Sequence, residues 1–104
     1  MTAQALFDGV AERLLREDDR LEKTRMMGSE GLKTNGKFFA MVSKGELVVK
    51  LPRERVDELV EAGTGHRFDP GHGRLMKEWV ALEPADEEEC TAYVTEARGY
   101  VGGL

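Results

Sequence analysis

The chain has 104 residues, 40% of them hydrophobic and 34% charged, and its net charge is −5. This length is typical of one domain with its own apolar core, here residues 1–104, and the composition excludes a disordered chain. The single cysteine excludes an internal disulfide and favours a cytoplasmic protein, and no apolar run approaches the ~20 residues of a membrane span.

The first segment of the chain predicts an amphipathic helix. Its apolar residues recur at helical spacing: Ala3, Leu6, Phe7, Val10 and Leu14. Thr2 is suited to cap the amino end, and the charged run at residues 17–20 is expected to end the helix.

The middle of the chain predicts a meander of three antiparallel strands. The Asn-Gly pair at 35–36 is the strongest short hairpin signal, because a type I′ turn needs positive φ at both central positions. The Lys-Gly pair at 44–45 is a weaker second turn signal. The segments LKT, KFFAMVS and ELVVKL around these turns are rich in β-forming residues. Gly28 and Gly31 in the first strand suggest a bulge or the close approach of another backbone.

The last half of the chain predicts two helices and a strand pair. Residues 52–63 predict a helix that lies across one face of the meander. Met76 to Leu82 predict a strand, with residues 66–68 as its short partner. Residues 85–103 predict a closing helix that has acidic residues in its first turn.

The expected fold is therefore an α+β two-layer sandwich with an antiparallel sheet. The expected order of elements is α-β-β-β-α-β-β-α, with the helices packed on the sheet.

The run RMMGSEGLKTNGKFFAMVSKGELVVKLP, followed by RFDPGHGRLMKEWV, resembles the TfoX/Sxy amino-terminal-domain family, named after bacterial regulators of natural competence. The likeness covers residues of about 24 to 101. The matching positions are Arg25-Met26, Gly28, Gly36-Lys37 before Phe39-Ala40, Val49 to Leu51, and Trp79. The resemblance implies the same order of elements, as in secretion chaperones and YjbR-like proteins, and a bacterial domain without established chemistry.

Two departures limit what this resemblance implies about function. Many members carry an aromatic residue followed by two glycines where this chain has Met27, Gly28 and Ser29. The competence regulators also attach a second, carboxy-terminal domain, and these 104 residues do not include one. We therefore expect the fold to transfer better than the regulatory role.

The stretch HRFDPGHGR, residues 66–74, holds both histidines of the chain. One interpretation is a metal site formed by His66, Asp69 and His72, with an open coordination position. Another is a contact to a ligand or a phosphate group. The favoured interpretation is a structural loop, because Asp-Pro-Gly is turn chemistry and the histidine spacing matches no compact ligand motif.

Cys90 and the methionines each allow two interpretations. A cysteine near a helix amino end can be a nucleophile, but acidic neighbours and an apolar stripe favour a core position for Cys90. Met26, Met27 and Met41 are expected in or near the core, and the alternative is an adaptable binding surface.

The charge is unevenly distributed along the chain. Residues 1–51 carry nine basic and eight acidic residues, a net of +1, whereas residues 52–104 carry six and twelve, a net of −6. The basic residues of the expected meander are Arg25, Lys33, Lys37, Lys44 and Lys50. They are either a solvated strand exterior or a basic strip for an anionic partner. The candidate residues for contact with a partner or anion are Arg25, Lys33, Lys37, His66, His72 and Arg74.

The sequence contains no Ser/His/Asp arrangement, Cys-x-x-Cys pair, phosphate-binding glycine loop or dinucleotide fingerprint. We therefore expect a non-enzymatic interaction or regulatory domain that needs no cofactor or metal and binds a protein partner or a second copy. The alternatives are a transcription-related nucleic-acid-binding protein and a small-ligand or metal enzyme. The acidic net charge argues against non-specific binding to phosphate backbones, whose affinity comes largely from displaced counterions.

Overall fold

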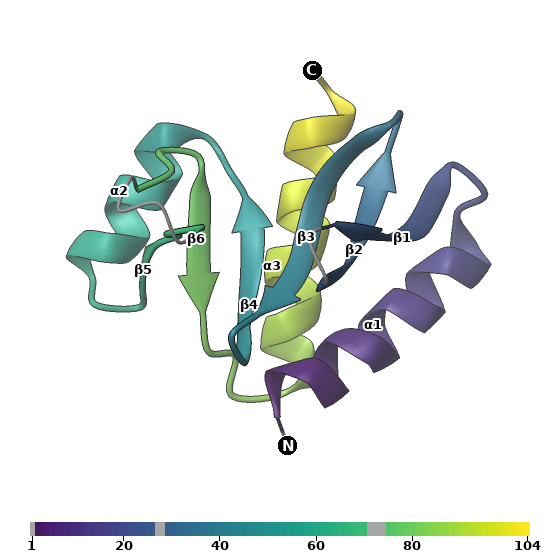
Figure 1. Cartoon of the computed structure of the whole chain (residues 1–104), viewed down its shortest axis with the longest axis horizontal. Coiled ribbons are helices and arrows are strands. Elements are labelled where there is room, and N and C mark those ends of the chain that lie inside the picture. Colours follow the sequence, from purple (N-terminus) through teal and green to yellow (C-terminus); the bar gives the residue numbers. More distant parts are fainter. Residues whose placement is uncertain (1, 27–28, 71–74) are drawn as a thin grey trace.

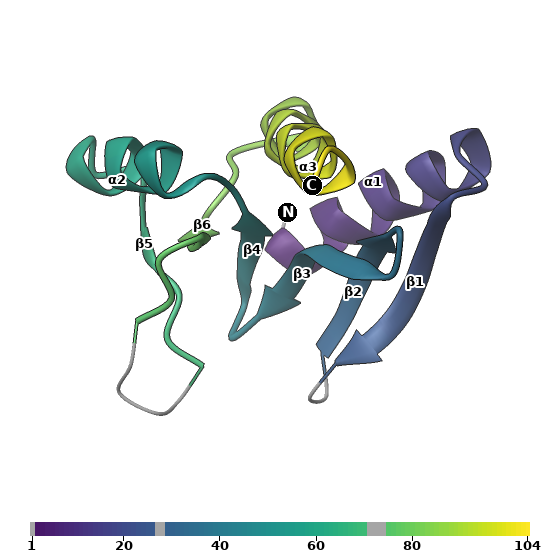
Figure 2. The ribbon, with the colours of Figure 1, turned by 90° about the horizontal axis from the view of Figure 1, so that it is seen from above.

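The computed structural model describes residues 2–26, 29–70 and 75–104. The elements are α1 (Ala3–Glu17), β1 (Leu21–Met26), β2 (Ser29–Thr34), β3 (Lys37–Ser43), β4 (Glu46–Lys50), α2 (Arg53–Glu61), β5 (Gly65–Arg67), β6 (Trp79–Leu82) and α3 (Glu87–Gly102) (Figure 1). The strands form one antiparallel sheet in the order β1-β2-β3-β4-β6-β5. The helices form a second layer on one side of this sheet (Figure 2). The predicted α+β class is confirmed, and so is the placement of the helices among the strands.

The sheet contains one strand more than we expected. The first strand of the predicted meander is two strands, β1 and β2, which pair antiparallel from Leu21↔Thr34 to Met26↔Ser29. Strand β1 lies at the edge of the sheet, and edge strands tolerate charged side chains. Its sequence LEKTRM therefore lacks the apolar alternation by which strands are recognised. Gly28 lies outside the described residues.

Both predicted hairpin turns are confirmed. Asn35 and Gly36 have φ values of 53° and 76°, and Lys44 and Gly45 have values of 53° and 77°. Positive φ at both central positions is the requirement of a type I′ turn, whose twist matches that of the flanking strands. The two turns place β3 between β2 and β4 in the sheet.

The predicted close approach at Gly31 is also confirmed. A Cβ atom at this position would lie 2.9 Å from the carbonyl oxygen of Ala40 and 3.0 Å from the ring of Phe38. The register between β2 and β3 shifts between Leu32 and Lys33, as in a β-bulge. Residue 31 therefore has to be small, because its neighbours already occupy that space.

The main core lies between the sheet and the helices. Strands β3, β4 and β6 contribute side chains that include Phe39, Leu47 and Leu82, which have exposed fractions of 0–1%. Helices α1 and α3 contact each other and the middle strands, and Phe7 is fully buried on α1. The apolar stripes of these helices therefore face one side of the sheet.

The sequence predicts that helix α2 lies across the meander, and this prediction is wrong. Its buried residues Val56 and Leu59 belong to the main core, and the helix contacts β5 and β6. Because β6 pairs directly with β4, the sheet extends beyond the meander. A helix of nine residues is only about 14 Å long, and α2 covers this extension.

The β5–β6 hairpin confirms the predicted short partner strand, but β6 is shorter than Met76 to Leu82. Regular pairing begins at Trp79, where the Phe68 N–H donates to the Trp79 carbonyl at 3.0 Å. The Met76 N–H donates to the Phe68 carbonyl at 2.9 Å. Residues 68–70 and 75–78 lie on the side of the sheet away from the helices (Figure 2).

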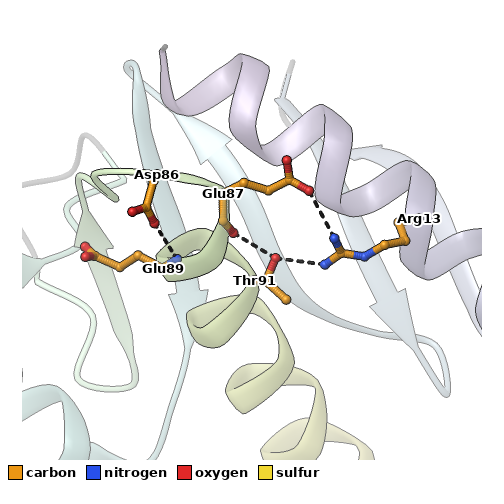
Figure 3. A network of polar contacts seen from close by, with 5 residues as sticks. All are labelled: Arg13, Asp86, Glu87, Glu89 and Thr91. Atoms are coloured by element: carbon orange, nitrogen blue, oxygen red, sulfur yellow. Dashed lines mark hydrogen bonds and ion pairs between the residues drawn. The ribbon is translucent and has the colours of Figure 1, made fainter.

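Polar contacts cap the amino end of α3 and join it to α1 (Figure 3). Asp86 caps α3 by accepting from the Glu89 N–H at 2.9 Å. Arg13 of α1 donates to Glu87 Oε1 at 3.0 Å and to Thr91 Oγ1 at 2.8 Å. These contacts join α1 to the first two turns of α3. Within the described ranges, no helix has the length and apolar character to cross a bilayer.

Candidate binding groove on the open sheet face

The sheet face opposite the helices carries a second, smaller apolar cluster. Side chains alternate between the two faces of a strand, so Met41, Val48 and Ala81 point away from the main core. Phe68 and Trp79 pack against these three residues. No helix of the described chain covers this cluster (Figure 2).

A groove of about 620 Å³ lies on this face. Its described lining consists of Phe38, Met41, Phe68, Pro70, Met76 and Trp79, together with Lys37, Lys44, Lys50 and Ser43. The apolar majority and the volume are both typical of ligand sites in proteins.

Three parts of the fold position the groove. Strand β3 supplies Phe38 and Met41, and β6 supplies Trp79. The segment after β5 supplies Phe68 and Met76, which a backbone hydrogen bond holds together. The rim therefore depends on the β5–β6 hairpin, and the floor depends on the central strands.

The groove lies beside unusually exposed apolar side chains. Met76 has an exposed fraction of 39%, and its neighbour Leu75 has one of 56%. In the described part of the chain, the only other exposed large apolar residue is Leu104, at the end of the chain. Exposed apolar surface beside a concave site indicates a contact surface.

The charged residues in the described lining are all lysines. Within the described residues, no ion pair joins Lys37 or Lys44 to a carboxylate. Lys50 Nζ lies 3.9 Å from Glu78 Oε1 and 6.0 Å from the centroid of the Trp79 ring. The latter contact is a cation–π interaction, which holds a positive charge over an aromatic wall of the groove.

The structure brings together most of the predicted basic strip. Lys37, Lys44 and Lys50 line the groove, and Lys33 Nζ lies 5.0 Å from the centroid of the Phe38 ring, which also lines it. Arg25 is not part of this group. Glu22 pairs with Lys33, and alternation along β1 puts Arg25 on the opposite face of the sheet. Contact of these residues with a partner stays a prediction.

His66 lies on the open face, where it is cross-strand from Ala81. Its Nε2 atom lies 2.9 Å from Glu46 Oε2. This hydrogen bond raises the pKa of His66 above its ordinary value, partial desolvation opposes the shift, and the Arg67 carbonyl and Glu83 add to it. The structure thus gives His66 a carboxylate partner, while His72 and Arg74 lie outside the described residues.

Substitution of Glu46 is expected to lower the pKa of His66. In Glu46→Gln the carboxylate that stabilises the imidazolium is lost, so the pKa moves back toward 6.5. Because the folded-state pKa is raised, wild type gains stability over the variant below pH about 6.5 and loses this gain as pH rises through the folded-state value. NMR titration measures the pKa directly, with His66→Gln assigning the signal. An unchanged pKa would contradict the role of Glu46.

The proposed metal set of His66, Asp69 and His72 is not tested, because His72 lies outside the described residues. Among residues 2–26, 29–70 and 75–104, no three His, Cys, Asp or Glu side chains are grouped so that they could hold a metal ion. Pro70 of the same loop lines the groove.

The structure places Cys90 in the main core, as expected. Its exposed fraction is 0%, and burial, followed by the nearby Glu87, raises the thiol pKa to about 11. The side chain is thus protonated near neutral pH and shielded from solvent. Both properties oppose a role as nucleophile.

We expect the thiol of Cys90 to be unreactive in the native protein. Ellman's reagent at pH 8 should label it at least 100-fold more slowly in the native protein than in guanidinium chloride. Both the ionisation of the thiol and its contact with the reagent require opening of the fold. The labelling rate, followed by absorbance, is the measurement. Equal rates in the two conditions would show that Cys90 is accessible.

Sequence reasoning missed the aromatic lining of the groove. The sequence places Phe38 and Trp79 in strands but does not show which face of the sheet they occupy. It places Phe68 in a short partner strand. One signal was present: the segment KFFAMVS holds a run of buried apolar residues instead of alternating ones. Such runs are typical of strands that are covered on both faces. Met41 is buried and lines the groove, so the two interpretations of this methionine are compatible.

The comparisons with known proteins agree with the predicted resemblance. The family model of the TfoX N-terminal domain matches residues 13–99. A search of curated proteins and a search of solved structures gave no match. The likeness to secretion chaperones and YjbR-like proteins therefore stays a prediction. The matched residues span most of the elements that build the sheet, the core and the groove, and the chain belongs to the TfoX N-terminal domain family.

Proposed function

We propose that this domain is a non-enzymatic interaction domain that binds a protein partner through the groove on its open sheet face. The observation that supports this proposal most is the groove itself, an apolar hollow of about 620 Å³ beside the exposed Met76. The helices cover the other face, so the partly exposed Phe38, Phe68 and Trp79 of the groove remain available to a partner.

The chemistry of the groove supports binding more than catalysis. Its described lining offers lysine ammonium groups and the hydroxyl of Ser43 but contains no carboxylate or imidazole, and Glu78 Oε1 lies 3.9 Å from Lys50 Nζ. Nucleophilic and general acid–base mechanisms need such a partner within hydrogen-bond reach. The proposal therefore assigns no reaction to this site.

Nucleic acid is the second candidate partner. Lysines beside aromatic rings, such as Lys50 at Trp79 and Lys33 at Phe38, are also found where single-stranded nucleic acids stack. The net charge of −5 opposes this candidate, because the protein as a whole repels a phosphate backbone.

Affinity capture from the native cell tests the proposal with a matched pair of variants. Met76→Glu places a charge at the groove, and Leu104→Glu makes the same change at an exposed residue in the last turn of the chain. Both side chains are exposed, so both variants should keep the melting temperature of the wild type. A partner held by wild type and Leu104→Glu, but lost from Met76→Glu, supports the proposal.

Capture that is equal for the three proteins would overturn the proposal. Sedimentation of the purified protein adds a second readout, because self-association lost only in Met76→Glu would identify a second copy as the occupant of the groove. A nuclease-sensitive complex would identify nucleic acid instead.

A further inference from the structure

We propose that the groove binds an extended acidic segment of the partner, with apolar side chains at its centre and carboxylates toward both ends. This inference rests on the proposed function and adds the chemistry of the occupant. The charges of the groove, their spacing and its aromatic walls support it independently of one another.

The charge of the groove selects an anionic occupant. All charged residues of the described lining are lysines, although the chain as a whole is acidic. Two carboxylates close in sequence to lining residues have partners of their own: Glu46 contacts His66, and Glu78 contacts Lys50 and accepts from Tyr100. Lys37 and Lys44 form no ion pair with any described carboxylate, so they are available to an acidic partner.

The spacing of the lysines favours an extended chain over a compact ligand. Lys37 begins β3 and Lys44 follows its last residue, and a strand of seven residues is about 20 Å long. Lys50 lies at the Lys37 end, because the antiparallel register pairs Ala40 with Val49. A small molecule with one anionic group contacts only one of these ends, whereas an extended peptide of about seven residues reaches both.

The walls between these ends suit apolar side chains. Met41 forms part of the floor at the middle of β3, and Trp79 and Phe68 pack on the same cluster. Met76 at the rim is flexible and exposed, so it can adapt to the side chain that it covers. Leucine or phenylalanine at the centre of the bound segment would bury apolar surface here.

Trp79 is the single tryptophan of the chain and lines the groove, so its fluorescence reports on binding. The probes are three heptapeptides with the same Leu-Phe-Leu centre and blocked ends. Two glutamates, two glutamines or two lysines stand on each side of this centre. We expect the glutamate peptide to bind at least tenfold more tightly than the glutamine peptide, and the lysine peptide not to bind. A fourth peptide, with glutamates around three serines, should also fail to bind.

Charge-removing variants provide the matched control. The double variant Lys37→Gln/Lys44→Gln should bind the glutamate peptide no more tightly than wild type binds the glutamine peptide. Lys23→Gln removes a lysine that pairs with Glu30 on the other face, and it should bind like wild type. Circular dichroism confirms that each variant is folded.

The possible results separate this inference from the proposed function. If the glutamate and glutamine peptides bind equally, the proposal of an acidic segment is overturned, and the proposed interaction domain stands. The same conclusion follows if no peptide binds while Met76→Glu still loses its captured partner. Tight binding of oligothymidine that displaces the glutamate peptide overturns it in favour of nucleic acid. Failure of both the peptides and the capture experiment overturns both proposals.

Discussion

Phe39→Ala is expected to lower the free energy of unfolding by roughly 3–5 kcal/mol, a large share of the 5–15 kcal/mol typical of such a domain. Phe39 is fully buried and belongs to the core between sheet and helices. Its loss leaves a cavity that a closed layer of helices cannot fill by relaxation. Urea denaturation followed by circular dichroism measures the change, as a lower transition midpoint with an unchanged slope.

Phe38→Ala is the matched control for this substitution. Phe38 is the preceding residue of the same strand, but it is partly exposed and lines the groove on the other face. Its replacement should cost clearly less stability than Phe39→Ala and should weaken binding of the glutamate peptide. If the two variants lost equal stability, the assignment of these neighbours to opposite faces would be wrong.

Gly31→Ala is expected to destabilise the protein by roughly 1–3 kcal/mol, the usual cost of adding a methyl group where there is no space. The new Cβ would lie 2.9 Å from the Ala40 carbonyl oxygen, a backbone atom that cannot move without disturbing the pairing of β2 with β3. The strand pair must therefore separate locally. A melting temperature lower by about 5–20 °C is the expected readout.

Gly9→Ala provides the opposite result at a glycine with free space. Gly9 lies within α1, and no atom of a neighbour comes within 4 Å of a Cβ built there. Alanine should raise the stability by about 0.5–1 kcal/mol, because glycine is unfavourable within a helix. A similar sign for both substitutions would show that backbone entropy, and not contact, determines the effect at Gly31.

The sequence located part of the candidate site and missed the rest. The lysines of the meander were recognisable because they lie in or beside strands that two turn signals separate. The sequence did not show that Arg25 lies on the opposite face, because strand β1 was not recognised. The aromatic lining was missed because Phe68 and Trp79 join the groove only through the pairing of β5 with β6 and of β6 with β4.

Local signals determined the helices, the hairpin turns and the small residue at position 31, because caps, positive φ and apolar periodicity act over a few residues. Only the tertiary structure decided that β1 flanks β2 and that β6 pairs with β4, which end of the sheet α2 covers and which face stays open. These features depend on contacts between distant segments, such as Lys50 with Trp79, that no local pattern encodes. The groove is one of them: the sequence supplied its lysines and aromatic residues, and the strand order brought them to one face.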